Sequence, residues 1–393
     1  MCRIAAIISK DTHTLSSRTQ TMTRALQHGG PDGSGLYVNE ALGYSLGHRR
    51  LSVIDTSSAG AQPMHSGQGR FCISYNGEIY NYQALREQLQ QLGYTFSSST
   101  DTEVILNGYA QWGLDLLPRL KGMFAFVLVD NEKGQLIAAR DAMGIKPLYM
   151  ARRGGDVYFS SEVKAFTAVE EGWEPNPEWR VWFLTFGFLP EPITTLQKVR
   201  PLPKGYYYLY DLHSGEATEA SWYVPGVSTN ATLATPTAAA SLSALEATTL
   251  TRQYVTEAIE RHIVSEVPVG VFLSGGIDSG IITAVAAAHL RQKGLPLDTL
   301  SIEFEDETCS EKPYQQAMAT ATGTRHHSLL VREEDFAEAW DDIYASLDQP
   351  TTDAVNNYFI CRFARRQGIK VVLSGLGADE LFGGYPSFNR TNT

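Results

Sequence analysis

The sequence predicts a two-domain α/β and α+β protein, with a β-rich first part followed by a doubly wound parallel sheet. Residues 1–210 contain short β-prone apolar runs between helical patterns. From Leu245 onward helical and strand patterns alternate, which favours a parallel sheet with helices on both faces. With 393 residues and 43% hydrophobic content, the chain can bury two cores.

In the first part, short runs of β-branched and aromatic residues predict strands, and apolar residues at helical spacing predict helices. Strands are expected at Phe71–Tyr75, Phe124–Val129 and Leu136–Ala139, and helices at Tyr82–Leu92 and Thr102–Trp112. This pattern is consistent with two packed sheets flanked by helices.

A linker is expected at residues 211–242, because this stretch is rich in Ser, Thr, Ala, Gly and Pro. Its centre is the segment Thr229–Ala238. The linker divides the chain into a first domain at residues 1–210 and a second domain at residues 243–393.

In the second part the expected elements alternate in type. Helices are expected at Leu250–Val264, Gly280–Arg291, Glu311–Thr322, Glu333–Leu347 and Ala354–Gln367, and strands at Val267–Leu273, Leu297–Phe304, Arg325–Val331 and Lys370–Ser374. In such a sheet ligands bind at the carboxyl ends of the strands.

The most informative motif is Ser274-Gly-Gly-Ile-Asp-Ser279, which follows an apolar strand and precedes a helix. Glycines let the backbone approach an oxyanion, hydroxyls can donate to it, and the N-terminus of a helix favours negative charge. The spacing fits neither the Walker loop nor G-x-G-x-x-G. The motif therefore predicts a phosphate site of another kind, and the carboxylate of Asp278 beside it suits Mg²⁺.

A second candidate is Cys2, which stands directly before an apolar strand. Removal of Met1 would free the α-amine of Cys2, and a thiol beside its own amine carries a general base. A cysteine at position two says little by itself, so its neighbours decide its meaning.

Several further blocks accompany Cys2. They are Gly30–Gly35, His48–Asp55, Tyr75–Asn81, Ser99–Val104 and Arg140–Tyr149. In this order they resemble the blocks of a class II glutamine amidotransferase domain. Together with the Ser274–Ser279 loop and the segment Ser374–Tyr385, the series is similar to the glutamine-hydrolysing asparagine synthetase family over nearly the whole chain. The resemblance implies an N-terminal αββα sandwich of the Ntn-hydrolase type and an ATP-pyrophosphatase domain.

The resemblance also implies roles for residues of the first domain. Cys2 is expected to be the nucleophile, and the Asn76 side chain and the Gly77 N–H are expected to form the oxyanion hole. Arg50 would hold the α-carboxylate of glutamine, and carboxylates would face its ammonium. The full expected glutamine site is Arg50, Leu51, Val53, Asn76, Gly77, Glu78 and Asp101.

In the second domain the resemblance implies a site for ATP and Mg²⁺. The expected ATP-binding residues are Leu273, Ser274, Gly275, Gly276, Asp278, Ser279, Ile302, Ser374 and Gly375. Asp278 is the expected Mg²⁺ ligand. Asp379 and Glu380 are candidates for the synthetase chemistry.

The sequence departs from the family pattern at several points. Position 3, usually Gly, is Arg3, and the block usually written Arg-Gly-Pro-Asp begins with Gly29. Leu376 stands where members carry a glutamate proposed as the base for ammonia, and leucine cannot take a proton. Asp379 or Glu380 would then substitute, or the acceptor differs from plain aspartate, or the chain belongs to a subgroup that does without this base. The chain also ends soon after Tyr385, so we expect the second domain to be incomplete.

The expected function is glutamine-dependent asparagine synthesis, in which Cys2 releases ammonia and ATP adenylates the side chain of aspartate with loss of pyrophosphate. Two alternatives stay open. One is an amidotransferase of the same architecture with another carboxylate acceptor, and the other is an inactive ATP- or glutamine-binding regulator.

The composition indicates which kinds of partner and which cellular compartment to expect. A net charge of −11 argues against nonspecific nucleic-acid binding. The four cysteines, at positions 2, 72, 309 and 361, have no C-x-x-C spacing, which suggests a reducing compartment. We find no signal peptide and no run long enough to span a membrane. We therefore expect a cytoplasmic enzyme with small-molecule substrates, and a homodimer stays open.

Overall fold

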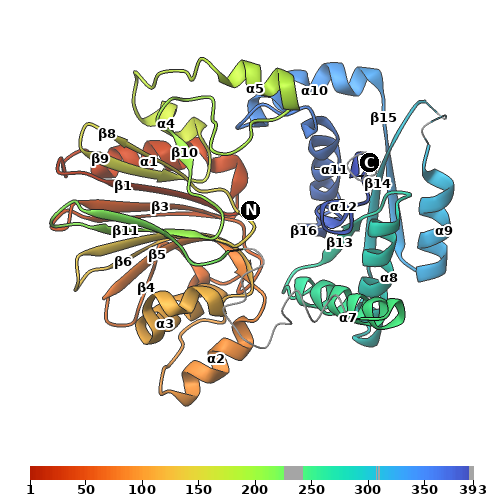
Figure 1. Ribbon diagram of the computed structural model, residues 1–393, viewed down its shortest axis with the longest axis horizontal. Helices are drawn as coiled ribbons and strands as arrows, with labels where there is room; N and C mark the ends of the chain where they lie inside the picture. Colours follow the sequence, from red (N-terminus) through yellow and green to blue (C-terminus); the bar gives the residue numbers. More distant parts are fainter. Residues whose placement is uncertain (225–241, 307, 309, 389–393) are drawn as a thin grey trace. The chain divides into compact units, whose positions relative to one another are not determined.

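The computed structural model describes residues 1–224, 242–306, 308 and 310–388 (Figure 1). The chain forms two compact units. Unit 1 comprises Met1–Thr237 and Asp348–Thr352, and unit 2 comprises Ala238–Leu347 and Asp353–Thr393. The short segment Asp348–Thr352, which follows a helix of unit 2 in the sequence, is thus part of unit 1.

Unit 1 is built on two six-stranded antiparallel sheets, with strand orders β10-β8-β9-β1-β3-β2 and β12-β11-β7-β6-β5-β4 (Figure 1). The strands, in chain order, are β1 (Arg3–Ile8), β2 (Gly33–Asn39), β3 (Tyr44–Arg50), β4 (Met64–His65), β5 (Phe71–Ile79), β6 (Gly122–Asp130), β7 (Gln135–Arg140), β8 (Tyr149–Arg153), β9 (Asp156–Ser160), β10 (Arg200–Pro201), β11 (Tyr206–Asp211) and β12 (Ala217–Ser221).

Strand β1 shows how the sequence builds these layers. Successive strand side chains point to opposite faces. Ile4, Ala6 and Ile8 enter the core between the two sheets, while Ala5 and Ile7 pack on the outer layer. Because both faces of β1 are covered, its sequence is apolar from Ile4 to Ile8, and all five of these residues are buried.

Helices cover the outer faces of both sheets, which confirms the predicted αββα sandwich. Helices α1 (Leu15–Ala25) and α4 (Lys164–Val169) contribute to the core outside β1. Helices α2 (Tyr82–Gln91) and α3 (Asp101–Trp112) lie on the side of β5 (Figure 1). The remaining elements are α5 (Trp179–Phe186) and the short 3₁₀ helices η1 (Gln27–Gly29), η2 (Ser58–Gly60) and η3 (Gly113–Arg119).

The linker prediction of residues 211–242 begins too early. Strand β11 extends to Asp211, and β12 pairs with it in register. The sequence Ala217–Ser221 resembles a linker because β12 is an edge strand whose side chains are mostly exposed. Residues 225–241 of the predicted linker lie outside the described residues.

Unit 2 contains a four-stranded parallel sheet of order β15-β14-β13-β16, as the alternating pattern predicted. Its strands are β13 (Val269–Phe272), β14 (Asp298–Phe304), β15 (Arg325–Val331) and β16 (Val371–Leu373). Its helices are α7 (Ala244–His262), α8 (Ile277–Gln292), α9 (Lys312–Thr322), α10 (Glu333–Ser346), α11 (Ala354–Arg366) and α12 (Ala378–Phe382).

The helices of unit 2 lie on both faces of this sheet. Apolar residues of α7 and α8 pack with Val271 on one face, and those of α11 pack with Leu300 on the other. Strand β13 lies between β14 and β16. The loops that follow β13 and β16 therefore leave the same edge of the sheet, side by side.

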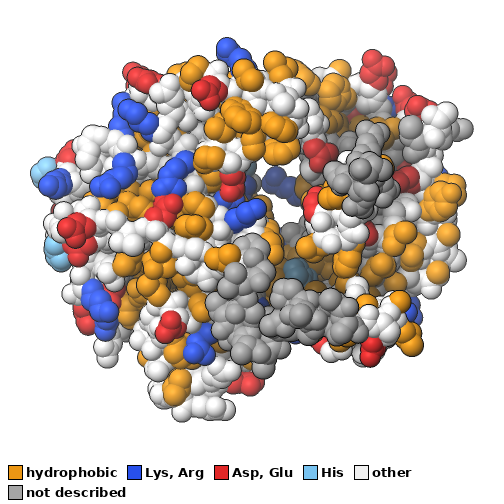
Figure 2. Space-filling model, in the orientation of Figure 1, with side chains coloured by type: hydrophobic (Ala, Val, Ile, Leu, Met, Phe, Trp, Pro, Cys, Tyr) orange, Lys and Arg blue, Asp and Glu red, His pale blue; other side chains and the backbone are white. Residues whose placement is uncertain are grey.

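Acidic and basic side chains are interspersed on the face of unit 1 drawn in Figure 2. Within the described ranges, no helix combines the length and the apolar character that crossing a membrane requires.

Candidate active sites

The Cys2 thiol is held at the start of β1 by the residue that follows β3. Its Sγ atom accepts a hydrogen bond from the Leu51 N–H at 3.3 Å and lies 3.6 Å from the Leu51 carbonyl oxygen. Burial raises the pKa of the Cys2 thiol, while the Leu51 contact and the charge of Arg50 oppose this rise. A thiol with a raised pKa needs a base to become a nucleophile.

Arg50 is the last residue of β3, and its guanidinium faces the loop that follows. It donates to the Ser57 carbonyl oxygen at 2.7 Å and also to the carbonyl oxygen of Asp55. A Cβ atom at Gly60 would lie 1.9 Å from Arg50 Nη2, so this glycine makes room for the guanidinium. Arg50 therefore shapes the loop in addition to any contact with a ligand. Val53 lies within the same loop, half-buried.

Asn76 and Gly77 lie in β5, opposite Ala125 and Phe124 of β6. Asn76 is 1% exposed, and its Nδ2 atom is buried without a hydrogen-bond partner among the described residues. A buried donor that lacks an acceptor costs free energy, so a ligand oxygen at this position would be favoured. At Gly77 a Cβ atom would lie 2.3 Å from the Met123 carbonyl oxygen, which explains the glycine there.

Asp101 begins α3, where the Thr100 side chain caps the helix by accepting from the Glu103 N–H at 3.2 Å. The Asp101 Oδ2 atom accepts from the Tyr75 hydroxyl at 2.7 Å and from the Ile79 N–H at 2.9 Å. These bonds fix the carboxylate at the end of β5. Burial raises the pKa of the Asp101 carboxyl against the effect of these donors.

Two further charged side chains, the half-buried Glu78 and the buried Lys146, act on the chain terminus. Burial raises the pKa of Glu78 to about 7, and the Lys146 ammonium opposes this rise. Lys146 is 4% exposed, and its Nζ atom lies 2.8 Å from Met1 Sδ. The charges of Arg50 and Asp101 act on Cys2, and those of Lys146 and Asp101 act on Glu78. The structure therefore brings the predicted glutamine-site charges together.

Sequence reasoning gave no role to Lys146, although it lies in the block Arg140–Tyr149. Asp141 folds this block by accepting from the N–H groups of Phe124, Ile145 and Lys146 at 3.1, 2.9 and 2.9 Å. The pattern that could have indicated Lys146 is an acidic residue, Asp141, followed by a turn at Gly144 and then the lysine. The turn delivers the lysine to the Cys2 site.

Unit 2 contains a pocket of about 390 Å³ at the carboxyl ends of β13, β14 and β16. Every predicted ATP-binding residue except Gly275 lines it, as do Asp379 and Glu380. Other lining residues include Phe272, Ser301, Glu311, Gln315, Asn356, Asn357, Leu376 and Tyr385. The two strand-end loops thus share one pocket, as expected if their strands are neighbours.

The Ser274–Ser279 loop is folded by its own hydroxyl groups. Ser279 Oγ lies 2.9 Å from Ser274 Oγ and accepts from the Ser274 N–H at 3.2 Å. Helix α8 begins at Ile277, and its first residues receive no side-chain cap. The Gly275 N–H donates to Glu311 Oε2 at 2.9 Å. The Glu311 carboxylate therefore accepts from an N–H group that could otherwise donate to a phosphate oxygen.

The second loop lies against the first. A Cβ atom at Gly375 would be 3.1 Å from the Cβ of Asp278, so glycine permits this close approach. The Tyr385 hydroxyl donates to Glu380 Oε1 at 2.9 Å. Leu376 lines the pocket with 78% of its surface exposed. No acid or base is thus supplied at position 376 itself.

Several pocket residues were missed by sequence reasoning, among them Glu311 and Gln315. Glu311 contacts the loop, and Gln315 has a buried Oε1 atom without a partner among the described residues. Both precede or lie in α9, far from the loop in sequence, and no local pattern marked them. Tertiary folding alone brings α9 beside α8.

In the described part of the chain, no group of three or more His, Cys, Asp or Glu side chains could hold a metal ion alone. Mg²⁺ is commonly bound by one or two carboxylates together with substrate phosphates. The Asp278 and Asp379 carboxylates, which line one pocket, fit that donor set.

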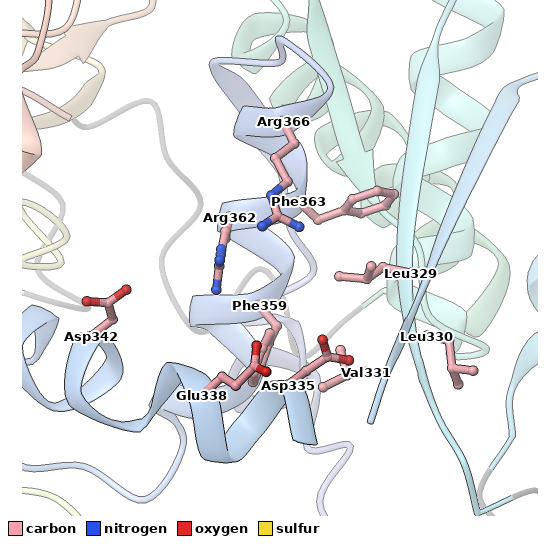
Figure 3. A pocket seen from close by; sticks show the side chains of 10 residues that line it. All are labelled: Leu329, Leu330, Val331, Asp335, Glu338, Asp342, Phe359, Arg362, Phe363 and Arg366. Atoms are coloured by element: carbon pink, nitrogen blue, oxygen red, sulfur yellow. The ribbon is translucent and has the colours of Figure 1, made fainter. Parts of the chain in front are cut away.

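Unit 2 has a second pocket of about 220 Å³, between α10, α11 and β15 (Figure 3). Acidic side chains project from α10 and arginines from α11, over an apolar floor that includes Leu329, Val331 and Phe363. None of the predicted site residues lines it. All of its charged side chains are exposed, so it lacks the buried polar group that would identify a ligand.

Comparisons with known proteins match the two parts of the chain separately. A family model described as a glutamine amidotransferase domain matches residues 1–223, and one described as asparagine synthase matches residues 250–393. A solved structure of a glutamine phosphoribosylpyrophosphate amidotransferase from B. subtilis matches 95% of this chain and 90% of its own chain, with 15% identity and a TM-score of 0.44.

Curated relatives have similar sequences over most of the chain. Asparagine synthetase [glutamine-hydrolyzing] 1 of Bacillus subtilis is 33% identical over 98% of this chain and 59% of its own length. A putative asparagine synthetase [glutamine-hydrolyzing] of Mycobacterium tuberculosis is 36% identical over 92% of this chain and 55% of its own length. The chain therefore spans little more than half of these two relatives.

A third relative is covered more completely. Putative asparagine synthetase [glutamine-hydrolyzing] 2 of Methanocaldococcus jannaschii is 32% identical over 98% of this chain and 76% of its own length. With both domain models and these relatives in agreement, the chain belongs to the glutamine-hydrolysing asparagine synthetase family.

Proposed function

We propose that the protein makes an amide from a carboxylate, with glutamine as the nitrogen donor and ATP as the energy source. The observation that carries the proposal is that one chain contains both kinds of site. Unit 1 has a half-buried thiol near charged side chains, and unit 2 has a pocket lined by two strand-end loops. Glutamine hydrolysis in one unit would supply ammonia for synthesis in the other.

In unit 1, the Cys2 thiol attacks the side-chain amide carbon of glutamine. The α-amine of Cys2, freed by removal of Met1, takes the thiol proton and returns it to the departing ammonia. The Asn76 Nδ2 group, unpaired among the described residues, and the Gly77 N–H stabilise the tetrahedral oxyanion. Arg50 faces the α-carboxylate, and Asp101 and Glu78 face the ammonium. Water then releases glutamate.

In unit 2, the Ser274–Ser279 loop holds the β- and γ-phosphates, and adenine and ribose lie against Leu273, Ile302 and the Ser374–Gly375 backbone. The acceptor carboxylate attacks the α-phosphorus, and pyrophosphate leaves. When bound, Mg²⁺ would neutralise charge on the phosphates, with Asp278 as a ligand. Ammonia then attacks the acyl-adenylate, which gives the amide and AMP. Glu311 must release the Gly275 N–H before a phosphate oxygen can accept from it.

Aspartate is the acceptor that the family favours, and asparagine is then the product. Leu376, exposed in the pocket, keeps another carboxylate acceptor open. Asp379 or Glu380 would serve as the base for ammonia in either case. The family also implies a cytoplasmic setting and small-molecule substrates only.

The deciding experiment is mass spectrometry of the products formed from ¹⁵N-amide glutamine, ATP and Mg²⁺ with a panel of carboxylic acids. Labelled asparagine with AMP is the expected result. A different labelled amide would support the other acceptor. Binding of ATP and glutamine with no product from any acid, in a longer form of the protein as well, would support a regulator.

A further inference from the structure

Arg3 and Gly29, two residues that depart from the family pattern, lie next to each other in unit 1. A Cβ atom at Gly29 would lie 2.7 Å from each of Arg3 Cγ, Nε and Cζ. Real Cβ atoms do not approach other heavy atoms so closely, so one of the two groups would have to move. The Arg3 side chain occupies the space beside position 29, and only glycine leaves that space free.

Arg3 cannot easily move away, because its guanidinium is anchored. Arg3 Nε donates to Glu162 Oε1 at 2.5 Å, and the two side chains are 14% and 6% exposed. His28 Nε2 lies 2.9 Å from the same carboxylate oxygen, and Lys164 Nζ lies 3.0 Å from Oε2. The Arg3 and His28 contacts and charges lower the pKa of Glu162 to about 2 in spite of its burial, so the anchor stays ionised.

The strand itself fixes the anchor relative to the nucleophile. The Ile4 N–H donates to Ser161 Oγ at 2.9 Å, and the Ser161 N–H donates to the Ile4 carbonyl oxygen at 3.0 Å. Residues 161 and 162 therefore run beside the first residues of β1. A guanidinium held here is in a defined position relative to the chain terminus.

The other end of the guanidinium holds the backbone of the terminus. Arg3 Nη1 donates to the Cys2 carbonyl oxygen at 3.1 Å and to the Met1 carbonyl oxygen at 3.2 Å. The first of these bonds would remain after Met1 is removed. Residue 2 otherwise precedes β1 and lacks the pairing of the sheet, so these bonds restrict the freedom of the nucleophile.

We propose that Arg3 is a positioning residue for the glutaminase reaction, and that Gly29 is required because it leaves room for the Arg3 side chain. Anchored on Glu162, Arg3 fixes the Cys2 backbone, and with it the thiol and the α-amine that must share a proton. This inference rests on the proposed glutaminase role of Cys2. A misplaced reactive group costs rate rather than substrate affinity.

The test is a double-mutant cycle between positions 3 and 29, with kcat and KM for glutamine hydrolysis measured for each variant. Arg3→Ala should lower kcat by about 10- to 100-fold with KM for glutamine unchanged, because Arg50 and Asp101 are untouched. Gly29→Ala should produce a similar loss. The double variant should be no worse than Arg3→Ala alone, because the added methyl no longer meets a guanidinium.

Two further variants separate positioning from folding. Arg3→Lys keeps a charge for Glu162, but one ammonium cannot replace the fork that spans carboxylate and carbonyl oxygens. The melting temperature of Arg3→Lys should be close to that of the unchanged protein, and its kcat should still be lower. Gly67→Ala is the control for Gly29→Ala, since a Cβ atom at Gly67 meets nothing within 4 Å, and it should be neutral.

The outcomes distinguish this inference from the proposed function. If the unchanged protein, with Met1 removed, hydrolyses no glutamine, the proposed role of Cys2 fails and the inference fails with it. If it hydrolyses glutamine but Arg3→Ala keeps its kcat, only the inference is wrong. Independent, additive losses at positions 3 and 29, or a rise in KM in place of a fall in kcat, would also overturn it.

Discussion

The thiol of Cys2 accepts a hydrogen bond from the backbone N–H of Leu51 at 3.3 Å, so the residue after β3 locates the nucleophile at the start of β1. This contact lies wholly in unit 1. We therefore expect Cys2→Ala to abolish glutamine hydrolysis and to leave ATP-dependent amide formation from added ammonium salts intact. Cys361→Ala, which removes an exposed thiol in unit 2, is the matched control. A folded Cys2→Ala protein that loses both activities would contradict the separation of the sites.

The α-amine at the terminus supplies a second prediction. With Met1 in place, burial lowers the pKa of the Met1 amine to about 6. That amine belongs to Met1, however, and not to the residue that carries the thiol. The Cys2 nitrogen is then an amide and cannot accept the thiol proton. A form that retains Met1, verified by intact mass, should behave like Cys2→Ala in a glutaminase assay. Full glutaminase activity in that form would show that another group is the base.

Much of this fold was predictable, because local pattern and tertiary structure agree. The expected strand Arg325–Val331 matches β15 in both bounds, and the loop motif begins just after β13 and ends in the first turn of α8. The start of the linker was wrong because β12 is exposed and polar. Edge strands need few apolar residues, so their sequence resembles a connection.

The sites were less predictable than the fold. Cys2 and Ser274 stand in local motifs, whereas Glu311 and Gln315 reach the pocket only through packing of α9 on α8. Lys146 was in a recognised block, but its burial near the chain terminus follows from the turn that Asp141 folds. Sequence pattern marks residues on strand-end loops well. It does not mark side chains delivered from a neighbouring helix.

Arg50→Ala should raise the KM for glutamine by roughly 30- to 1000-fold, since loss of a charge-assisted contact to a carboxylate costs about 2–4 kcal/mol. Arg50 also binds the Ser57 carbonyl oxygen, so thermal melts must accompany the kinetics. Arg49→Ala is the comparison, because Arg49 donates to the Thr23 carbonyl oxygen, and it should keep KM near normal. If the KM for glutamine rises only in Arg49→Ala, then Arg49, and not Arg50, binds the α-carboxylate of glutamine.

Glutamine binding should weaken as the pH falls below about 7, where the Glu78 carboxylate takes up a proton. A protonated carboxyl cannot pair with the substrate ammonium, so KM should rise by at most roughly tenfold per pH unit below that value. In Glu78→Gln this dependence should disappear, with KM high throughout. Glu87→Gln, an exposed change on α2, should keep the profile. An unaltered profile in Glu78→Gln would assign the titration to another group.

The reaction class depends on the loop of unit 2, and Asp278 tests it. Because Ser274–Ser279 is expected to hold pyrophosphate as the leaving group, ATP should be cut between the α- and β-phosphates, with AMP and pyrophosphate as products. Asp278→Asn removes a charged oxygen ligand from the pocket and should abolish this cleavage while Cys2-dependent glutaminase continues, whereas the exposed Asp341→Asn on α10 should cleave normally. Chromatography of the nucleotide products decides the matter. ADP and phosphate would replace the acyl-adenylate with an acyl-phosphate mechanism, and the loop would then need another role.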